Sequence, residues 1–122
     1  MSENILHITS RKAWQAAQRA GQYAPPSLTS EGFIHCSTRA QVLPVAEKFY
    51  RGQTGLILLV IDPTRLASAL KWEPPFDGAP PPGVSGAAAF PHIHGPLNLE
   101  AVVQVLDFEP ASDGQFVLPR GT

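Results

Sequence analysis

Two short segments of the chain repeat the same spacing of a histidine and a hydroxyl side chain. His7 is followed two residues later by Thr9, and His35 is followed two residues later by Ser37. In a β-strand, residues i and i+2 point to the same face, so each segment presents an imidazole and a hydroxyl together. If the two strands are neighbours, these uncharged groups can hydrogen-bond a ribose or an amide; the alternative is that each histidine binds a backbone carbonyl. The repeated spacing favours a binding site.

The other two histidines, His92 and His94, are also two residues apart. Strand alternation places both rings on one face, a spacing that suits a divalent metal ion. The following carboxylate, Glu100, lies at a spacing that differs from that of His-x-His metal motifs, and no histidine follows His94. Gly95 and Pro96 instead predict a bend after the strand, where a ligand can approach the backbone closely.

A carboxylate and an indole are adjacent at the end of another predicted strand, in Trp72 and Glu73. Partial desolvation by the indole would raise the pKa of Glu73 and suit acid–base catalysis, and the alternative is an exposed carboxylate at a rim. Cys36 is predicted to be a small buried hydrophobe, because no neighbouring basic residue lowers the pKa of its thiol. Gln41 and Asn98 are candidate amide contacts.

The composition fits one domain and excludes several classes of partner. With 122 residues and a formal net charge of −1, the chain has no basic excess to hold a nucleic acid. Its single cysteine excludes an intrachain disulfide. The longest apolar run, residues 56–61, is far shorter than the roughly 20 residues of a spanning helix, and the N-terminus has no signal-like segment. We therefore expect a cytoplasmic protein with no membrane partner.

The pattern of apolar and turn residues predicts an α+β domain over residues 1–122, with a core at about 4–109. One helix is predicted over residues 11–20, capped by Ser10 and ended by Gly21, and a second over 39–50, capped by Thr38 and starting late or kinked at Pro44. Strands are predicted over residues 4–9, 32–37, 56–61, 70–73, 92–97 and 101–108, with an edge strand at 116–118. Residues 23–30 and the Pro/Gly/Ala-rich segment 74–89 are predicted loops, the second of them mobile.

With these residues in view, the chain resembles the DUF952 family of small bacterial proteins of unknown function. The resemblance covers about residues 5–108 and is carried by the segments Leu6-His7-Ile8-Thr9, Trp14, Gly21-x-Tyr23, Ser27-Leu28, Glu31-Gly32-Phe33-Ile34-His35-Cys36-Ser37-Thr38, Gln41, Phe49-Tyr50, Leu58-Leu59-x-Ile61-Asp62, Trp72-Glu73 and Phe90-Pro91-His92-Ile93-His94-Gly95-Pro96-Leu97-Asn98. One departure is His94, where the family usually has tyrosine, so the resemblance implies no metal role for that ring.

The family looks related in fold to ADP-ribosyltransferases, including the tRNA 2′-phosphotransferases. This resemblance implies a split, strongly curved antiparallel or mixed sheet with two N-terminal helices, gripping NAD+ in a cleft. The residues that it assigns to NAD+ binding are His7, Thr9, His35, Ser37, Thr38 and Gln41, with the first two at the adenosine ribose and the next two at nicotinamide. Glu73, or His92 in its place, would steady the positive charge that develops at the ribose, with no metal required.

Three hypotheses follow. The first is an NAD+- or ADP-ribose-binding protein that transfers ADP-ribose or cleaves the nicotinamide–ribose bond, with an acceptor that the sequence does not specify. The second is a binding module that has kept the cleft without catalysis and senses a nucleotide or a peptide. The third is a divalent-metal site through His92 and His94.

Overall fold

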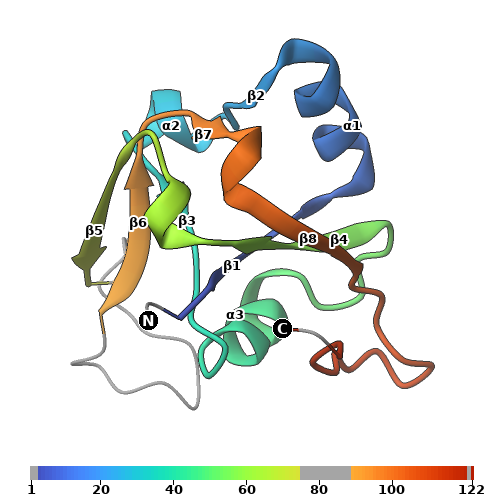
Figure 1. The fold of residues 1–122 in the computed structure, drawn as a ribbon. Helices are drawn as coiled ribbons and strands as arrows, with labels where there is room; N and C mark the ends of the chain where they lie inside the picture. Colours follow the sequence, from blue (N-terminus) through green and yellow to red (C-terminus); the bar gives the residue numbers. More distant parts are fainter. Residues whose placement is uncertain (1–2, 75–88, 121) are drawn as a thin grey trace.

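The computed structural model describes residues 3–74, 89–120 and 122, and their strands form three antiparallel sheets (Figure 1). The first sheet has the order β1-β4-β8, the second β3-β6-β5, and the third pairs β2 with β7. The strands are β1 (Ile5–Ser10), β2 (Gln22–Tyr23), β3 (Ile34–His35), β4 (Leu56–Ile61), β5 (Ala69–Glu73), β6 (Phe90–His94), β7 (Leu97–Asn98) and β8 (Val102–Asp107). The prediction of an α+β fold is confirmed.

Three α-helices and two 3-10 turns connect the strands: α1 (Arg11–Ala20), α2 (Ser27–Ser30), α3 (Val42–Phe49), η1 (Pro63–Arg65) and η2 (Leu99–Ala101). The prediction for α1 is confirmed at both ends. The Ser10 hydroxyl accepts a hydrogen bond from the Ala13 backbone N–H at 3.0 Å, and Gly21 ends the helix with a φ of 88°. Among the described residues, no helix has the length and apolar character needed to cross a bilayer.

The turn that leads into α3 is closed by a capping box. The Thr38 hydroxyl accepts a hydrogen bond from the Gln41 N–H at 3.3 Å, and the Gln41 side-chain oxygen accepts one from the Thr38 N–H at 3.0 Å. The Gln41 amide also donates to the Ala89 carbonyl at 2.8 Å. The helix proper begins at Val42, which confirms the late start expected from Pro44.

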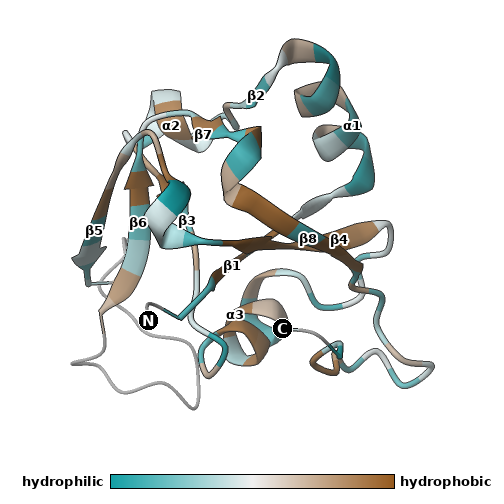
Figure 2. Cartoon of the chain, in the orientation of Figure 1, coloured by the Kyte–Doolittle hydropathy of each residue, from teal (hydrophilic) through white to brown (hydrophobic). Residues whose placement is uncertain are grey.

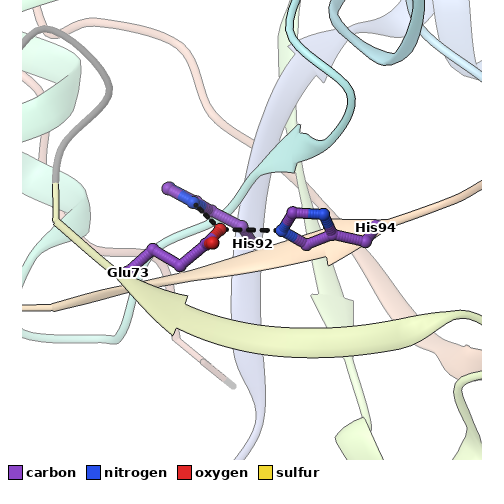
Figure 3. A group of neighbouring side chains, drawn as sticks. All are labelled: Glu73, His92 and His94. Atoms are coloured by element: carbon purple, nitrogen blue, oxygen red, sulfur yellow. Dashed lines mark hydrogen bonds and ion pairs between the residues drawn. The ribbon is translucent and has the colours of Figure 1, made fainter.

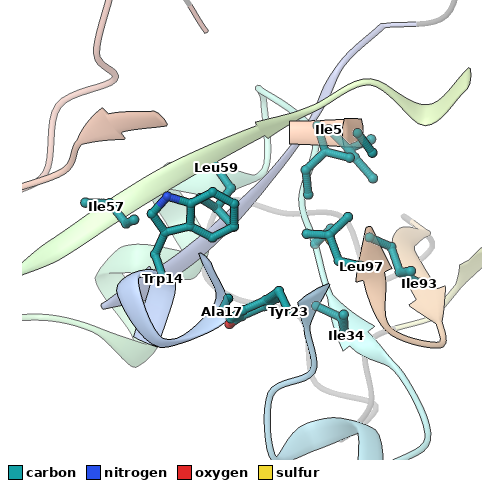
Figure 4. Packing of buried hydrophobic residues seen from close by; sticks show 12 residues of the cluster. Ile5, Trp14, Ala17, Tyr23, Ile34, Ile57, Leu59, Ile93 and Leu97 are labelled. Atoms are coloured by element: carbon teal, nitrogen blue, oxygen red, sulfur yellow. The ribbon is translucent and has the colours of Figure 1, made fainter. Parts of the chain in front are cut away.

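The central strand β4 is buried on both faces and separates two apolar clusters (Figure 2). One cluster joins alternate β4 residues to α1 through Trp14 and Ala17, and extends to Ile34 and Ile93 of the second sheet (Figure 4). The other joins the remaining β4 residues to α3, Phe108 and Phe116. The continuous apolar run of β4 therefore holds helices on opposite faces of one sheet.

The first and second sheets are joined at one isolated backbone bridge, between Leu6 and Ser37. Each residue donates its N–H to the carbonyl of the other at 2.8 Å. This bridge shows that the two segments with the His-x-hydroxyl pattern are neighbours, which was the condition for their side chains to form one site.

A buried polar network crosses this junction. The His7 ring contacts the His35 carbonyl through Nδ1 at 2.5 Å and the Tyr23 hydroxyl through Nε2 at 2.7 Å. The Tyr23 hydroxyl lies 2.9 Å from the Thr9 hydroxyl. Burial lowers the pKa of His7 to about 4, so the ring is neutral near pH 7.

Three expectations about the strands are wrong. In the described part of the chain, the expected strongly curved sheet is replaced by three separate sheets, of which the first and second meet at the Leu6–Ser37 bridge. Residues 116–118 form no strand; Phe116 instead stacks on Phe108 with ring centroids 4.8 Å apart. The segment 23–30, predicted as loop, contains the end of β2 and the short helix α2.

The strand predicted over residues 92–97 ends at His94, because the chain turns at Gly95 and then pairs with β2. Gly95 has a φ of 152°, and a Cβ there would lie 2.5 Å from the Ser68 hydroxyl oxygen. The group that approaches the Gly95 backbone closely is therefore the Ser68 side chain and not a ligand. The Ser68 hydroxyl also donates a hydrogen bond to the Pro96 carbonyl at 2.7 Å.

We expect the Thr38→Ala substitution to lower the free energy of unfolding by about 1 kcal/mol, because it removes the hydroxyl half of the capping box. Urea denaturation of the variant and the wild type measures this difference. Thr29→Ala, at an exposed position in α2, is the control and should change stability by less than about 0.5 kcal/mol. Equal effects of the two substitutions would contradict the capping role.

We also expect His7 to make the fold sensitive to acid. Its pKa is about 4 in the folded protein and 6.5 in a solvated chain, so the unfolded chain binds the extra proton between these values. The contribution of the neutral His7 ring to the free energy of unfolding is therefore fully present above pH 6.5. The free energy of unfolding falls by up to about 3 kcal/mol as the pH is lowered towards 4.

The measurement is urea denaturation of the wild type and His7→Asn across this pH range. The substitution destabilises the protein at neutral pH, but it removes the titrating ring, so the gap between the two proteins should narrow as the pH falls. Parallel curves for the two proteins would show that His7 is not held neutral by the fold.

Candidate functional site

A hollow of about 320 Å³ opens beside β1, next to the junction of the two sheets. Its wall includes His7 and Thr9 from β1, Tyr23 from β2 and His35 from β3. The remaining lining residues come from β1, from the start of α2 and the segment before it, and from the α3–β4 connection and the first residue of β4: Ile8, Ser10, Pro25, Pro26, Ser27, Tyr50, Gln53 and Leu56. We call this space the β1 hollow.

The hydrogen-bonded network of His7, Tyr23 and Thr9 in the wall of the β1 hollow is electrically neutral. Because a carbonyl only accepts, the neutral His7 ring carries its proton on Nδ1, and Nε2 is then an acceptor for the Tyr23 hydroxyl. The single Tyr23 proton is thereby used, so the contact with Thr9 is made by the Thr9 hydroxyl donating to the Tyr23 oxygen. Burial raises the pKa of Tyr23 to about 12, which keeps the phenol protonated.

The structure brings together three of the six residues predicted to bind NAD+. His7, Thr9 and His35 line the β1 hollow. Ser37 is buried and its backbone forms the bridge to Leu6. Thr38 and Gln41 form the capping box before α3, and none of these last three is among the described residues that line the hollow.

Sequence reasoning from spacing missed the two tyrosines of the hollow, Tyr23 and Tyr50. Burial raises the pKa of Tyr50 as well, so both phenols remain neutral. No local pattern links these residues to His7, because the contacts join segments that are far apart along the chain. The only sequence signal was their presence among the segments that carry the family resemblance.

A second group of polar side chains lies on the sheet β3-β6-β5 and consists of Glu73, His92 and His94 (Figure 3). One Glu73 oxygen, Oε1, accepts hydrogen bonds from His92 Nδ1 at 2.9 Å and from His94 Nε2 at 2.7 Å. Register explains the grouping: β5 runs antiparallel to β6, with Glu73 opposite Phe90 and Lys71 opposite His92. Residues of this parity share one face of the sheet. We call these three residues the glutamate–histidine cluster.

Aromatic and charged neighbours surround this cluster. The Phe33 ring stacks on His92 with centroids 4.1 Å apart and planes at 14°, and it also lies 5.3 Å from the His94 ring. His35 packs edge-on against His92 at 5.4 Å between centroids. The other side of the His35 ring forms a hydrogen-bonded pair with Glu31. His92 is therefore held in place on several sides.

The charge of Glu73 differs from the expectation based on Trp72. Hydrogen bonds from His94 and His92 hold the pKa of Glu73 below its usual value, so the carboxylate is ionised at neutral pH. The predicted rise in the pKa of Glu73 is wrong because the indole does not cover the carboxylate. Trp72 alternates with Glu73 along β5, so it lies on the opposite face of the sheet, and it is 53% exposed. Burial lowers the pKa of His92, an effect that the hydrogen bond to Glu73 partly opposes.

The β1 hollow and the glutamate–histidine cluster meet at His35. This residue lines the hollow, its carbonyl binds His7, and its ring contacts His92. Glu73 and His92, the predicted catalytic residues, are not among the described residues of the hollow wall. The two sites are thus adjacent but separate.

Two other candidate residues, Cys36 and Asn98, have structural roles in the fold. Cys36 is buried, and burial raises the pKa of its thiol, as expected for a small hydrophobe. The Asn98 side chain accepts a hydrogen bond from the Ala67 N–H at 2.8 Å and donates one to the Arg65 carbonyl at 2.9 Å. Its amide therefore fastens the connection between β4 and β5.

Solved structures similar to this chain come from one bacterial protein, CC0527 of Caulobacter crescentus. Its X-ray structure is 34% identical in sequence, with a TM-score of 0.80 and 94% of each chain covered. The X-ray structure of a variant with two methionine substitutions gives 33% identity, a TM-score of 0.79 and the same coverage. The solution NMR structure gives 34% identity and a TM-score of 0.74, with 92% of this chain and 90% of that chain covered.

No curated protein matches the chain. The family described as "Protein of unknown function (DUF952)" matches residues 8–105, a span that begins one residue after His7 and contains His35 and the whole glutamate–histidine cluster. The predicted resemblance is thereby confirmed at the level of the family. The chain belongs to the DUF952 family.

Proposed function

We propose that this protein binds NAD+ or ADP-ribose in the β1 hollow. The observation that carries the proposal is the convergence of His7, Thr9, Tyr23 and His35, from three separate strands, on one hollow of about 320 Å³. Both members of the His-x-hydroxyl pair on β1, His7 and Thr9, line the hollow, whereas of the second pair only His35 does.

The size of the hollow suits part of a dinucleotide. Ligand pockets in proteins range from about 300 to 1,000 Å³, so this hollow lies at the lower end. It therefore takes one nucleoside half, a base with its ribose, while the remainder of the ligand lies over the rim formed by Pro25, Pro26 and Gln53.

The chemistry of the wall also suits a nucleoside. The hydroxyl oxygens of Thr9 and Tyr23 can accept hydrogen bonds from ribose hydroxyls, and the Tyr50 ring offers an aromatic surface for a base. The neutral His7 and the protonated tyrosines add no charge that would disfavour an uncharged ribose or base. The expectation from the sequence that the family is related to ADP-ribosyltransferases is the reason for proposing a nucleotide as the ligand.

The observations favour binding over bond cleavage. Cleavage of the nicotinamide–ribose bond builds positive charge at the ribose and requires a carboxylate close to it. Glu73, predicted for this role, is hydrogen-bonded to two imidazoles and is not among the described residues of the hollow wall. We therefore propose the non-catalytic binding module, the second of the sequence-based hypotheses.

Isothermal titration calorimetry with NAD+ and with ADP-ribose tests the binding proposal. We expect both to bind the wild type, and Thr9→Val to weaken binding about tenfold, because valine keeps the shape of threonine but lacks its hydroxyl. Thr64→Val, outside the hollow, is the matched control and should bind like the wild type. Absence of heat with both ligands, or equal affinities for the two variants, would overturn the proposal.

A nicotinamide-release assay separates binding from catalysis. We expect no release from NAD+ by the wild type above the rate without protein, and the same result for Glu73→Gln. An NAD+ glycohydrolase in the same buffer serves as the positive control. Release by the wild type that Glu73→Gln abolishes would show that the protein is an enzyme and that Glu73 acts on the bound nucleotide.

A further inference from the structure

We propose that Glu73, His92 and His94 form a binding site for a divalent first-row transition metal ion of the Zn²⁺ class. This proposal is independent of nucleotide binding in the β1 hollow, and it departs from the expectation that the protein needs no metal. It also goes beyond the histidine pair in the sequence, because the third ligand, Glu73, comes from the neighbouring strand β5.

The positions of the three side chains are close to those of a metal site. One potential ligand atom from each residue lies within 4.8 Å of the other two, and Glu73 Oε1 lies within 2.9 Å of both imidazole nitrogens. Two ligands of a tetrahedral ion with bonds of about 2.1 Å are roughly 3.4 Å apart. Small side-chain rotations that draw the carboxylate back and the two rings together would create the space for an ion.

The donor atoms select the kind of ion. Two imidazole nitrogens and one carboxylate oxygen are preferred by Zn²⁺, Fe²⁺ and related ions, whereas Mg²⁺ and Ca²⁺ favour oxygen ligands throughout. The carboxylate supplies one negative charge against the two positive charges of the ion. Three protein ligands leave at least one coordination position open for water or for an oxygen atom of a small ligand.

Neighbouring side chains already hold the ligands in position. Phe33 stacks on His92 and lies against His94, and His35 packs on the edge of His92. Such support fixes ring orientations before an ion arrives and reduces the cost of ordering the ligands.

The cluster is also reachable from solvent. The side chain of His92 is 2% exposed, whereas those of His94 and Glu73 are 25% and 35% exposed. The site is therefore anchored in the protein at His92 and open at the other two residues. An ion can enter from this side without unfolding of the sheet.

Metal binding would change which nitrogen of each ring carries the N–H. In the structure His92 Nδ1 and His94 Nε2 both face Glu73, and each donates an N–H hydrogen bond to the carboxylate. On metal binding the facing nitrogen becomes the ligand, and the ring N–H is on the other nitrogen. The tautomer change gives a spectroscopic signature that a simple hydrogen-bonded cluster lacks.

The test is a Zn²⁺ titration of the full chain, purified without a histidine tag and treated with a chelator. We expect calorimetry to give one Zn²⁺ per chain, and ¹⁵N NMR of the imidazoles to show metal on His92 Nδ1 and His94 Nε2. Glu73→Gln and His94→Asn should each weaken binding at least about tenfold, the loss typical of removing support from a metal site.

Glu31→Gln is the matched control, since it makes the same chemical change at a carboxylate that pairs with His35 and lies outside the cluster. It should bind Zn²⁺ within about threefold of the wild type, and thermal unfolding without metal should show that all variants fold. No binding by the wild type, or affinities that are equal in Glu73→Gln and Glu31→Gln, would overturn the proposal. Binding with unchanged imidazole ¹⁵N shifts would also do so, since it would place the ion elsewhere.

Discussion

The backbone pairing between Leu6 and Ser37 is the constraint on which the rest of the structure depends. It is the one bridge, among the described residues, that joins the sheet β1-β4-β8 to the sheet β3-β6-β5. His7 follows directly after this bridge, and its ring reaches the carbonyl of His35. Beyond the bridge, none of the described strands pairs with this side of β1, and the β1 hollow opens between β1, Tyr23 and the segment that leads into α2. The hollow is thus a product of how the two sheets meet.

The parts of the fold that the sequence predicts are those fixed by local chemistry. Ser10 and Gly21 bound α1 because a hydroxyl cap and a left-handed glycine act within a single turn. Strand alternation likewise placed His92 and His94 on one face. Curvature and strand neighbours depend on long-range pairing, so the prediction of a strongly curved sheet was wrong. For the same reason the nearest carboxylate in sequence, Glu100, was considered with the histidine pair, whereas the pairing of β5 with β6 places Glu73 there.

The two polar sites differ in how their hydrogen bonds are satisfied. In the network at the β1 hollow, both His7 nitrogens and the Tyr23 proton have partners, and every group is neutral. In the glutamate–histidine cluster, a single carboxylate oxygen accepts from two imidazoles, and the carboxylate keeps its charge. A neutral hydrogen-bonding network suits uncharged parts of a ligand, because no charged group of the protein must lose its hydration when the ligand binds. A charged carboxylate oxygen between two imidazole nitrogens suits a cation. The chemistry of the two sites therefore points to different ligands.

His35 contributes its backbone carbonyl to the network of the β1 hollow and its ring to the glutamate–histidine cluster. Its carbonyl binds His7, while its ring packs against Phe33 and His92. A side-chain substitution at this position removes the ring but keeps the backbone carbonyl, so the polar network of the hollow retains its anchor while the cluster loses a packing neighbour. The pairing of His35 with His92 across β3 and β6 sets both arrangements at once. Because the strand β3 is only two residues long, the position of each site depends on the same short backbone segment.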